Sequence, residues 1–330
     1  MTDRKYVTEL ALGFFSKGVV LLHPKDIRTI DQQSPQATEL AEDCHIYLII
    51  KRPRLSYLPS SLVIGDEKTV GRFKYAKNGV VKEAEFSLQG KPDADSVEIS
   101  SYPHTKLSLV RGGEPVFTIP AHLMSMMCDY ISEPEVRDLE VVYVGMSYAD
   151  GKRSAKDRLL SHSTLQQVLA DLNQDFPDME ALIIMVQYEP PQVLISIDGR
   201  DKSLDPNRDR HVVSDLKRQQ TVVTKDLQIA LIEAALIKYF EPCYNDKYKK
   251  RFPQPTQKIL QEVYDIDFGA LITEINTEEI KSRLFSNVRS AGYHHIASYD
   301  LHDPSERRSF FNAMNVEHGS DADNHSGPIY

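Results

Sequence analysis

The chain has 330 residues, 41% of them hydrophobic, and a net charge of −9, which describes an ordinary globular protein with room for two domains. The acidic total excludes a general nucleic-acid coat, so phosphate binding must come from local basic clusters. The three cysteines are far apart and form no CxxC pair, which argues against a disulfide framework and a zinc site. We see no signal peptide and no apolar stretch long enough for a membrane span, and expect a cytoplasmic protein without a membrane partner.

Residues 1 to about 120 contain short segments of strand character, separated by turn formers such as Asn78-Gly79 and Gly112-Gly113. No nucleophile, metal-ligand cluster or phosphate loop stands out among them. We expect a β-rich N-terminal domain over residues 1–120, of the sandwich or barrel type, with its role left open. The expected strands are Val19 to His23, His45 to Lys51, Ser61 to Gly65, Gly71 to Ala76, Glu83 to Gly90, Val97 to Tyr102 and Lys106 to Arg111.

After Pro120 the sequence changes to alternating strand and helix patterns. An apolar strand from Leu139 to Gly145 follows a charged turn, which predicts that Tyr130 and Tyr143 lie on two neighbouring antiparallel strands. The segment from Ala181 to Glu189 is almost continuously apolar, which predicts a central strand.

Between these strands we expect a helix that begins at Ser154, where Asp157 completes a capping pair. Arg158 and His162 lie four residues apart on this helix, on a seam that continues through leucines. Their two polar side chains therefore share the inward-facing side of the predicted helix.

The stretch from Thr224 to Asn245 predicts a long helix with one misplaced charge. Glu233 has only apolar neighbours at three and four residues, and a carboxylate there is unfavourable unless it is paired, hydrogen-bonded, protonated or bound to a cation. Two interpretations follow: a salt bridge to an arginine elsewhere in the core, or a functional site. The expected solvent stripe of this helix is Lys225, Gln228, Ala235 and Lys238.

Residues 256–314 predict a C-terminal α/β extension. Its expected elements are a helix at Lys258 to Tyr264, a strand at Gly269 to Asn276, a helix beginning at the cap Thr277, and a strand from Tyr293. The tail over residues 315–330 is rich in Asp, Asn, His, Ser and Gly and predicts disorder.

The order of these motifs resembles the GIY-YIG nuclease superfamily over about residues 126 to 246. Tyr143-Val144-Gly145 corresponds to the second signature of that family, and Cys128-Asp129-Tyr130 lies where the first signature is expected. The segment around Glu233, followed by Pro242 and Asn245, is the most specific part of the match. The resemblance implies an α+β fold: the β-rich N-terminal domain, then a GIY-YIG-like domain over residues 121–255 with a small central sheet flanked by helices, then the C-terminal extension.

The resemblance also implies roles for single residues. Glu233 would hold Mg²⁺ or Mn²⁺, and Tyr130 would orient or deprotonate a water molecule. Arg158 would offer its guanidinium fork to a phosphate oxygen, with Arg153 as the alternative arginine. The expected catalytic residues are Tyr130, Tyr143, Arg158, His162, Glu233 and Asn245.

Basic residues gather beside these motifs despite the acidic total, and tyrosine and phenylalanine are interleaved with them. Solvated loops often have the same composition. The expected nucleic-acid contacts are Lys152, Arg153, Lys247, Lys249, Lys250 and Arg251.

Together these patterns predict a metal-dependent endonuclease that hydrolyses phosphodiester bonds in DNA, in repair, restriction or phage defence. The main alternative is a non-catalytic binding module with the same fold, for nucleic acid or protein. A further alternative is an effector that cleaves RNA with the same chemistry.

Overall fold

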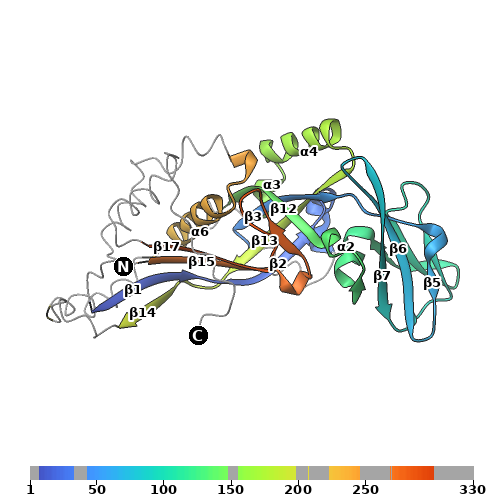
Figure 1. The fold of residues 1–330 in the computed structure, drawn as a ribbon, viewed down its shortest axis with the longest axis horizontal. Helices are drawn as coiled ribbons and strands as arrows, with labels where there is room; N and C mark the ends of the chain where they lie inside the picture. Colours follow the sequence, from blue (N-terminus) through green and yellow to red (C-terminus); the bar gives the residue numbers. More distant parts are fainter. Residues whose placement is uncertain are drawn as a thin grey trace.

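A computed structural model of the protein describes residues 7–32, 43–147, 155–197, 207, 223–245, 268 and 270–300. Over these residues the fold is α+β and rich in strands, as the sequence predicts (Figure 1). The helices of the described ranges are α2 (Ala121–Met127), α3 (Ala155–Leu159), α4 (Ser163–Asp175) and α6 (Lys225–Phe240), with short 3₁₀ turns between other elements.

A five-stranded sheet, here called the central sheet, carries the residues of interest. Its middle strand β3 is buried on both faces because the run from Ile46 to Ile50 is apolar throughout. The predicted strand after Ala181 is confirmed and pairs with β3, as does the strand that carries Tyr143. The strand order is β16 (Arg283–Phe285), β12 (Asp138–Met146), β3 (Ile46–Pro53), β13 (Met179–Tyr188) and β2 (Ser16–Leu22).

A four-stranded second sheet lies beside the central sheet and combines both ends of the described chain (Figure 1). Its order is β14 (Gln192–Ile197), β1 (Thr8–Phe14), β15 (Ala270–Asn276) and β17 (His294–Asp300). The strands predicted near residues 270 and 294 are therefore confirmed. They complete a sheet that begins with the first described strand of the chain.

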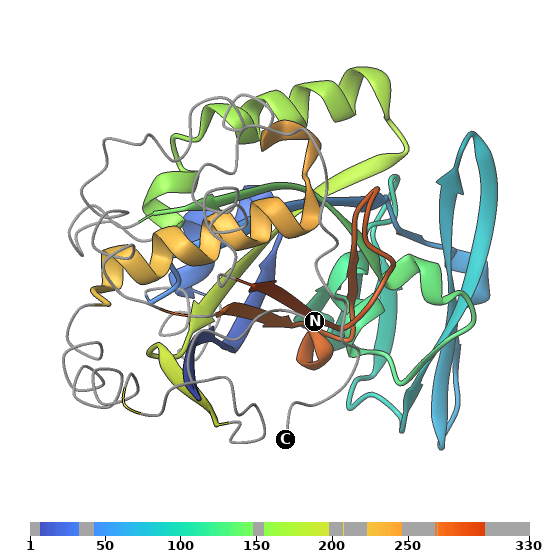
Figure 2. The same cartoon turned by 60° about the vertical axis from the view of Figure 1, so that its left-hand side comes forward.

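An inserted unit, residues 54–137, separates β3 from β12 in the chain. It holds one sheet of order β11-β7-β6-β4, with β5 on β6, and one of order β10-β9-β8, around its own apolar core. In Figure 2 its strands β6 and β7 (blue-green) stand on the opposite side of the molecule from α6 (orange). Its strands are β4 (Ser56–Tyr57), β5 (Val63–Ile64), β6 (Lys68–Lys77), β7 (Val80–Gln89), β8 (Ser96–Ile99), β9 (Lys106–Arg111), β10 (Glu114–Pro120) and β11 (Tyr130–Ile131).

The sheet pairing differs from the predicted division of the chain at residue 120. β1, β2 and β3 do not pair with the inserted strands; they pair with strands of the second and central sheets. Short strands in sequence order favoured one local β unit, but antiparallel partners such as β3 and β12 can be joined by a connection of any length. The β-rich unit therefore consists of residues 54–137 rather than 1–120.

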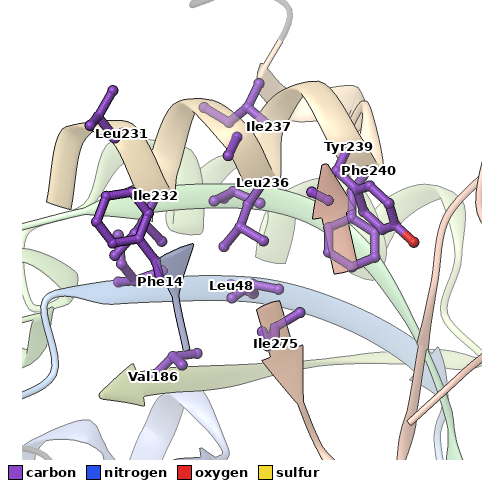
Figure 3. Close-up of a cluster of buried hydrophobic side chains, with 14 of the residues drawn as sticks. Phe14, Leu48, Val186, Leu231, Ile232, Leu236, Ile237, Tyr239, Phe240 and Ile275 are labelled. Carbon is purple, nitrogen blue, oxygen red and sulfur yellow. The ribbon is translucent and has the colours of Figure 1, made fainter. Parts of the chain in front are cut away.

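Helix α6 is buried on nearly all sides because it packs against both sheets. Figure 3 shows its side chains, among them Ile232 and Leu236, beside residues of the two sheets such as Leu48 and Ile275. The predicted solvent stripe is therefore only partly correct: Lys225 is exposed, but Gln228 and Ala235 are buried. A helix that is apolar around most of its circumference needs cover on more than one side, and the second sheet supplies it.

The predicted helix after Thr277 is wrong. The chain forms only a 3₁₀ turn, Glu278–Ile280, and then β16, which pairs with the start of β12. Thr277 does not cap a helix, because its hydroxyl donates to the backbone oxygens of Ser282 and Tyr293. Tertiary pairing here overrides a good local helix pattern. The predicted helix at Lys258 to Tyr264 and the tail lie outside the described residues.

The outer edge of the central sheet at β2 is covered by side chains. The backbone N–H of Ser16 donates to Glu274 at 2.7 Å, and the N–H of Val19 donates to Glu279 at 2.6 Å. Both carboxylates come from the segment of the second sheet and the turn that follows it. Donors that a neighbouring strand would otherwise satisfy are thus paired with glutamates.

Arg52, near the end of β3, joins the inserted unit to the central sheet. Its side chain is fully buried and donates to Glu180 at 2.9 Å, to Ser125 Oγ at 2.9 Å and to the backbone oxygen of Val136 at 3.2 Å. Glu180 lies on β13, whereas Ser125 and Val136 belong to the inserted unit. A buried ion pair of this kind is strongly destabilising when only one partner is removed.

We therefore expect Arg52→Leu to lower the free energy of unfolding by about 3–5 kcal/mol, because Glu180 is left buried without its cation. Arg72→Leu is the matched control, since its ion pair with Glu83 is exposed and should contribute at most about 1 kcal/mol. Urea denaturation of both variants measures the difference. Equal losses in the two variants would contradict the assigned role of Arg52, and adding Glu180→Leu should recover most of the loss.

Candidate active site

Two tyrosines from neighbouring strands share one face of the central sheet. Tyr47 on β3 lies opposite Gly145 on β12, and the rings of Tyr47 and Tyr143 have centroids 6.2 Å apart. Both side chains belong to the apolar cluster that α3 and α4 cover, on the face away from α6. The pairing of β3 with β12 therefore brings together two phenols that are far apart in the sequence.

Gly145 is required by the approach of these rings. A Cβ atom at this position would lie 2.6 Å from Tyr47 Cζ and Oη and 2.6 Å from Tyr143 Cε1. Distances this short are below the van der Waals contact distance, and the obstructing atoms belong to buried rings that cannot easily move aside. The glycine thus has a packing role beside the two phenols, beyond ending a strand.

His162 fixes the orientation of Tyr47. It is the N-cap of α4, where its Nδ1 accepts the backbone N–H of Leu165 at 3.1 Å, and its Nε2 lies 3.0 Å from Tyr47 Oη. Burial, with the charge of Arg158, lowers the pKa of His162 to about 4, so the ring is neutral at pH 7. Because Nδ1 is an acceptor, the proton sits on Nε2, and His162 donates to Tyr47.

The predicted single helix through Arg158 and His162 is wrong. α3 ends at Leu159, and His162 has an extended backbone before α4 begins. A histidine side chain that caps the next helix offers the backbone an alternative to continuing the first one. Arg158 and His162 nevertheless lie close enough for the Arg158 charge to lower the pKa of His162.

Tyr47 lies where the other side chains of the site converge. It is only 1% exposed, and burial, with the nearby charge of Glu233, raises its pKa above the ordinary range. Hydrogen bonds to Arg158 and Tyr143 and the Arg158 charge oppose that shift. Desolvation dominates, so Tyr47 is a neutral phenol whose oxygen faces several donors that would stabilise a tyrosinate.

Glu233 approaches this group from the other face of the sheet. Its side chain on α6 reaches the edge of β12, and it is 9% exposed. Burial raises its pKa to about 8, against the effect of a hydrogen bond from the backbone N–H of Met146 and the charge of Arg158. The arginine whose charge acts on Glu233 is Arg158, so the salt-bridge interpretation and the functional interpretation both point to this pair.

Asn245 completes the edge of β12. Its Oδ1 accepts the N–H of Val144 and its Nδ2 donates to the oxygen of Val144, both at 2.9 Å. β16 pairs only with Asp138 to Glu140, so the amide of Asn245 takes the place of a strand farther along the edge. Alternate residues face the same edge, which is why Val144 meets Asn245 and Met146 meets Glu233.

The structure places Tyr130 away from this group. It lies on β11, which pairs with β7 of the inserted unit, and its side chain is 53% exposed. The prediction that Tyr130 and Tyr143 lie on neighbouring strands is therefore wrong. Tyr130 is closer in sequence to β12, but the strand that pairs with β12 is β3.

Tyr47 is the residue of the site that the sequence analysis missed. The available signal was the pair Ile46-Tyr47 at the start of a fully apolar run, the pattern of a central strand. Of the predicted site residues, the structure brings together Tyr143, Arg158, His162, Glu233 and Asn245. The predicted nucleic-acid contacts Lys152, Arg153, Lys247, Lys249, Lys250 and Arg251 lie outside the described residues.

Among the residues that the structure describes, no group of three or more His, Cys, Asp and Glu side chains is arranged to hold a metal ion. An ion at Glu233 would therefore need water and substrate oxygens as its other ligands. No helix in the described ranges has the length and hydrophobicity of a membrane span. Comparison with protein-family profiles, curated proteins and solved structures finds no match to this chain.

The tight contact at Gly145 is directly testable. Gly145→Ala should lower the free energy of unfolding by about 1–3 kcal/mol, because the new methyl group forces Tyr47 and Tyr143 out of their positions. Gly292→Ala is the control, since a Cβ there lies no closer than 3.5 Å to any atom outside its immediate neighbours. Chemical denaturation compares the two, and equal stability of both variants would contradict the tight packing at Gly145.

Proposed function

We propose that this protein is a metal-dependent endonuclease of the GIY-YIG type that hydrolyses phosphodiester bonds in DNA. The observation that carries the proposal is the convergence of two phenols, a neutral histidine, an arginine and a buried carboxyl at one edge of β12. Most of these residues are the ones the family resemblance selects. Polar groups with shifted pKa values that gather at one point are typical of functional sites.

The position of Tyr47 supports a revised form of the resemblance. We read His45-Ile46-Tyr47 as the remnant of the first signature, in place of Cys128-Asp129-Tyr130, because it retains both the isoleucine and the tyrosine. Tyr47 then pairs across the sheet with the Tyr143-Val144-Gly145 signature. In this reading residues 54–137 are an insertion between the two signature strands.

The donor set suits magnesium or manganese. Glu233 offers hard carboxylate oxygens, and magnesium commonly binds through one or two carboxylates while keeping several waters and substrate oxygens. The raised pKa of Glu233, about 8, also fits a carboxyl that awaits a cation. When bound, the ion supplies Lewis-acid stabilisation of the phosphate charge.

The side chains divide the remaining work. Arg158 places a fixed positive fork beside Tyr47, suited to a phosphate oxygen in the transition state. Tyr47 orients the attacking water with its phenol oxygen; it would accept the proton of that water only after its own phenol proton has passed to solvent, a loss that the charges of Arg158 and of a bound metal ion would favour. The Nε2–H of His162 donates a hydrogen bond to Tyr47 Oη, so His162 would stabilise a tyrosinate and is not itself the base. Asn245 holds the strand that presents Tyr143.

Two alternatives use the same geometry. A non-catalytic binding module would keep the fold but would not depend on the phenol oxygen of Tyr47. An RNA-cleaving effector would share every residue role and differ only in its substrate. Incubation of the purified protein with plasmid, single-stranded DNA and RNA, with and without Mg²⁺ or Mn²⁺, separates the three.

The two candidate tyrosines give the sharpest test of the site. We expect Tyr47→Phe to reduce cleavage about 10²- to 10⁴-fold, because it removes the oxygen that orients water and accepts its proton. Tyr130→Phe should cleave at the normal rate, since Tyr130 lies on the inserted unit. Initial rates on plasmid DNA decide between them, and loss of activity in Tyr130→Phe alone would restore the original assignment.

Glu233→Gln should change how stability depends on pH. The carboxyl has an ordinary pKa of 4.5 and a folded pKa of about 8. Between these values the folded protein holds a proton that the unfolded chain releases, so the free energy of unfolding falls as the pH rises from about 4.5 to about 8. The variant should lack this decrease in urea titrations with chelator, and it should not cleave DNA.

Glu83→Gln is the matched control, because it makes the same carboxyl-to-amide change at an exposed side chain. Added Mg²⁺ at pH 8.5 should raise the Tm of the wild type and of Glu83→Gln but not that of Glu233→Gln. An equal rise in all three proteins would show that the ion binds elsewhere.

A further inference from the structure

The side of α6 opposite Glu233 is held by polar contacts that the proposed chemistry does not use. The hydroxyl of Tyr299, on β17, donates to the backbone oxygen of Ala235 at 2.8 Å. Tyr299 is buried, and its bond enters the middle of the helix rather than one of its ends. A helix carbonyl is normally satisfied within the helix, so this second donor ties α6 to the sheet beside it.

Two more contacts hold the C-terminal turn of α6 on the same side. Tyr239 Oη lies 3.2 Å from His295 Nδ1, and Arg289 Nε donates to the backbone oxygen of Tyr239 at 2.9 Å. The Arg289 guanidinium also stacks 4.3 Å from the centroid of the Tyr239 ring. His295 Nε2 lies within hydrogen-bonding distance of backbone oxygens of Leu284 and Gly292, which makes Nδ1 the acceptor for the Tyr239 hydroxyl.

These contacts matter because Glu233 and Ala235 point in different directions. Successive helix residues are rotated by about 100°, so two positions apart gives about 200° and nearly opposite sides of α6. Glu233 meets β12 on one side while β17 holds the helix on the other. The carboxyl reaches the edge of β12 only if α6 has the correct height along its axis, and the Tyr299 hydrogen bond is directional whereas the hydrophobic effect is not.

We propose that Tyr299 is a positioning residue for Glu233: its hydrogen bond to Ala235 fixes α6 at the height where the carboxyl meets the edge of β12. Strand β17 is thus part of the machinery that places the metal ligand. The inference rests on the proposed function only in taking Glu233 as that ligand.

The test compares Tyr299→Phe with Tyr57→Phe. Tyr57 is the matched control: it is a buried tyrosine whose hydroxyl donates to the backbone oxygen of Ile119 at 3.0 Å, inside the inserted unit. Both changes remove one phenol-to-carbonyl bond and should cost similar stability. Only Tyr299→Phe should affect Glu233.

Two readouts are needed. Carbon-13 NMR of the glutamate carboxyls follows the titration of Glu233, whose resonance is assigned with Glu233→Gln. We expect the pKa of Glu233 to fall toward its ordinary value in Tyr299→Phe, because a loosened helix admits water, and to stay unchanged in Tyr57→Phe. Cleavage measured against Mg²⁺ concentration should show a half-saturating concentration raised about tenfold in Tyr299→Phe, with a near-normal rate at saturation.

An unchanged Glu233 titration in Tyr299→Phe, or the same change in both variants, would overturn the positioning role. A shifted titration with no cleavage by any of the proteins, the wild type included, would support the positioning role and refute the proposed nuclease. Cleavage by the wild type with equal metal dependence in all variants would keep the nuclease and refute the role of Tyr299.

Discussion

The central sheet depends on how the backbone N–H and C=O groups along the outer edge of β12 find hydrogen-bond partners. β16 covers only the beginning of this strand, and the next hydrogen-bonding positions along the edge are met by side chains from α6 and the turn after it. Asn245 acts as a substitute strand for Val144, and the Glu233 carboxyl faces the N–H of Met146. Because α6 and the tyrosines lie on opposite faces, this edge is where the carboxyl can join the phenols. One requirement of backbone hydrogen bonding thus assembles the site.

The inserted unit connects the two strands that carry the tyrosines, β3 and β12. β3 leads from Tyr47 to Arg52, and Arg52 is bound on one side to the central sheet and on the other to the inserted unit. The residues that pair β3 with β12 run from Ile46 to Lys51 and from Glu140 to Met146, all outside the inserted unit. The apolar core around Tyr47 and Tyr143 and the apolar core of the inserted unit are therefore separate. A small set of buried polar contacts connects the two parts.

The sequence predicts the local elements of the site better than their pairing. Glu233 could be identified because a charge among apolar neighbours is visible at helical spacing, and the strand of Tyr143 because its pattern is apolar. The local pattern identifies the strand of Tyr47 as a central strand but could not identify Tyr47 as a site residue. The pairing of β3 with β12 joins segments separated by the whole inserted unit, and local sequence does not determine it. The sequence identifies His162 as a site residue but assigns it to the wrong element, since its capping bond competes with a continuous helix.

Within the described chain, side chains cover strand-edge positions on both sides of the central sheet: Glu274 and Glu279 along β2, and Asn245 and Glu233 along the part of β12 beyond β16. Open strand edges are templates on which other chains polymerise, and inward-pointing charges are a common protection against it. The carboxyl proposed for chemistry therefore also covers part of a strand edge. An apolar substitution at Glu233 would remove the proposed metal ligand and, in the same change, leave the N–H of Met146 without its acceptor.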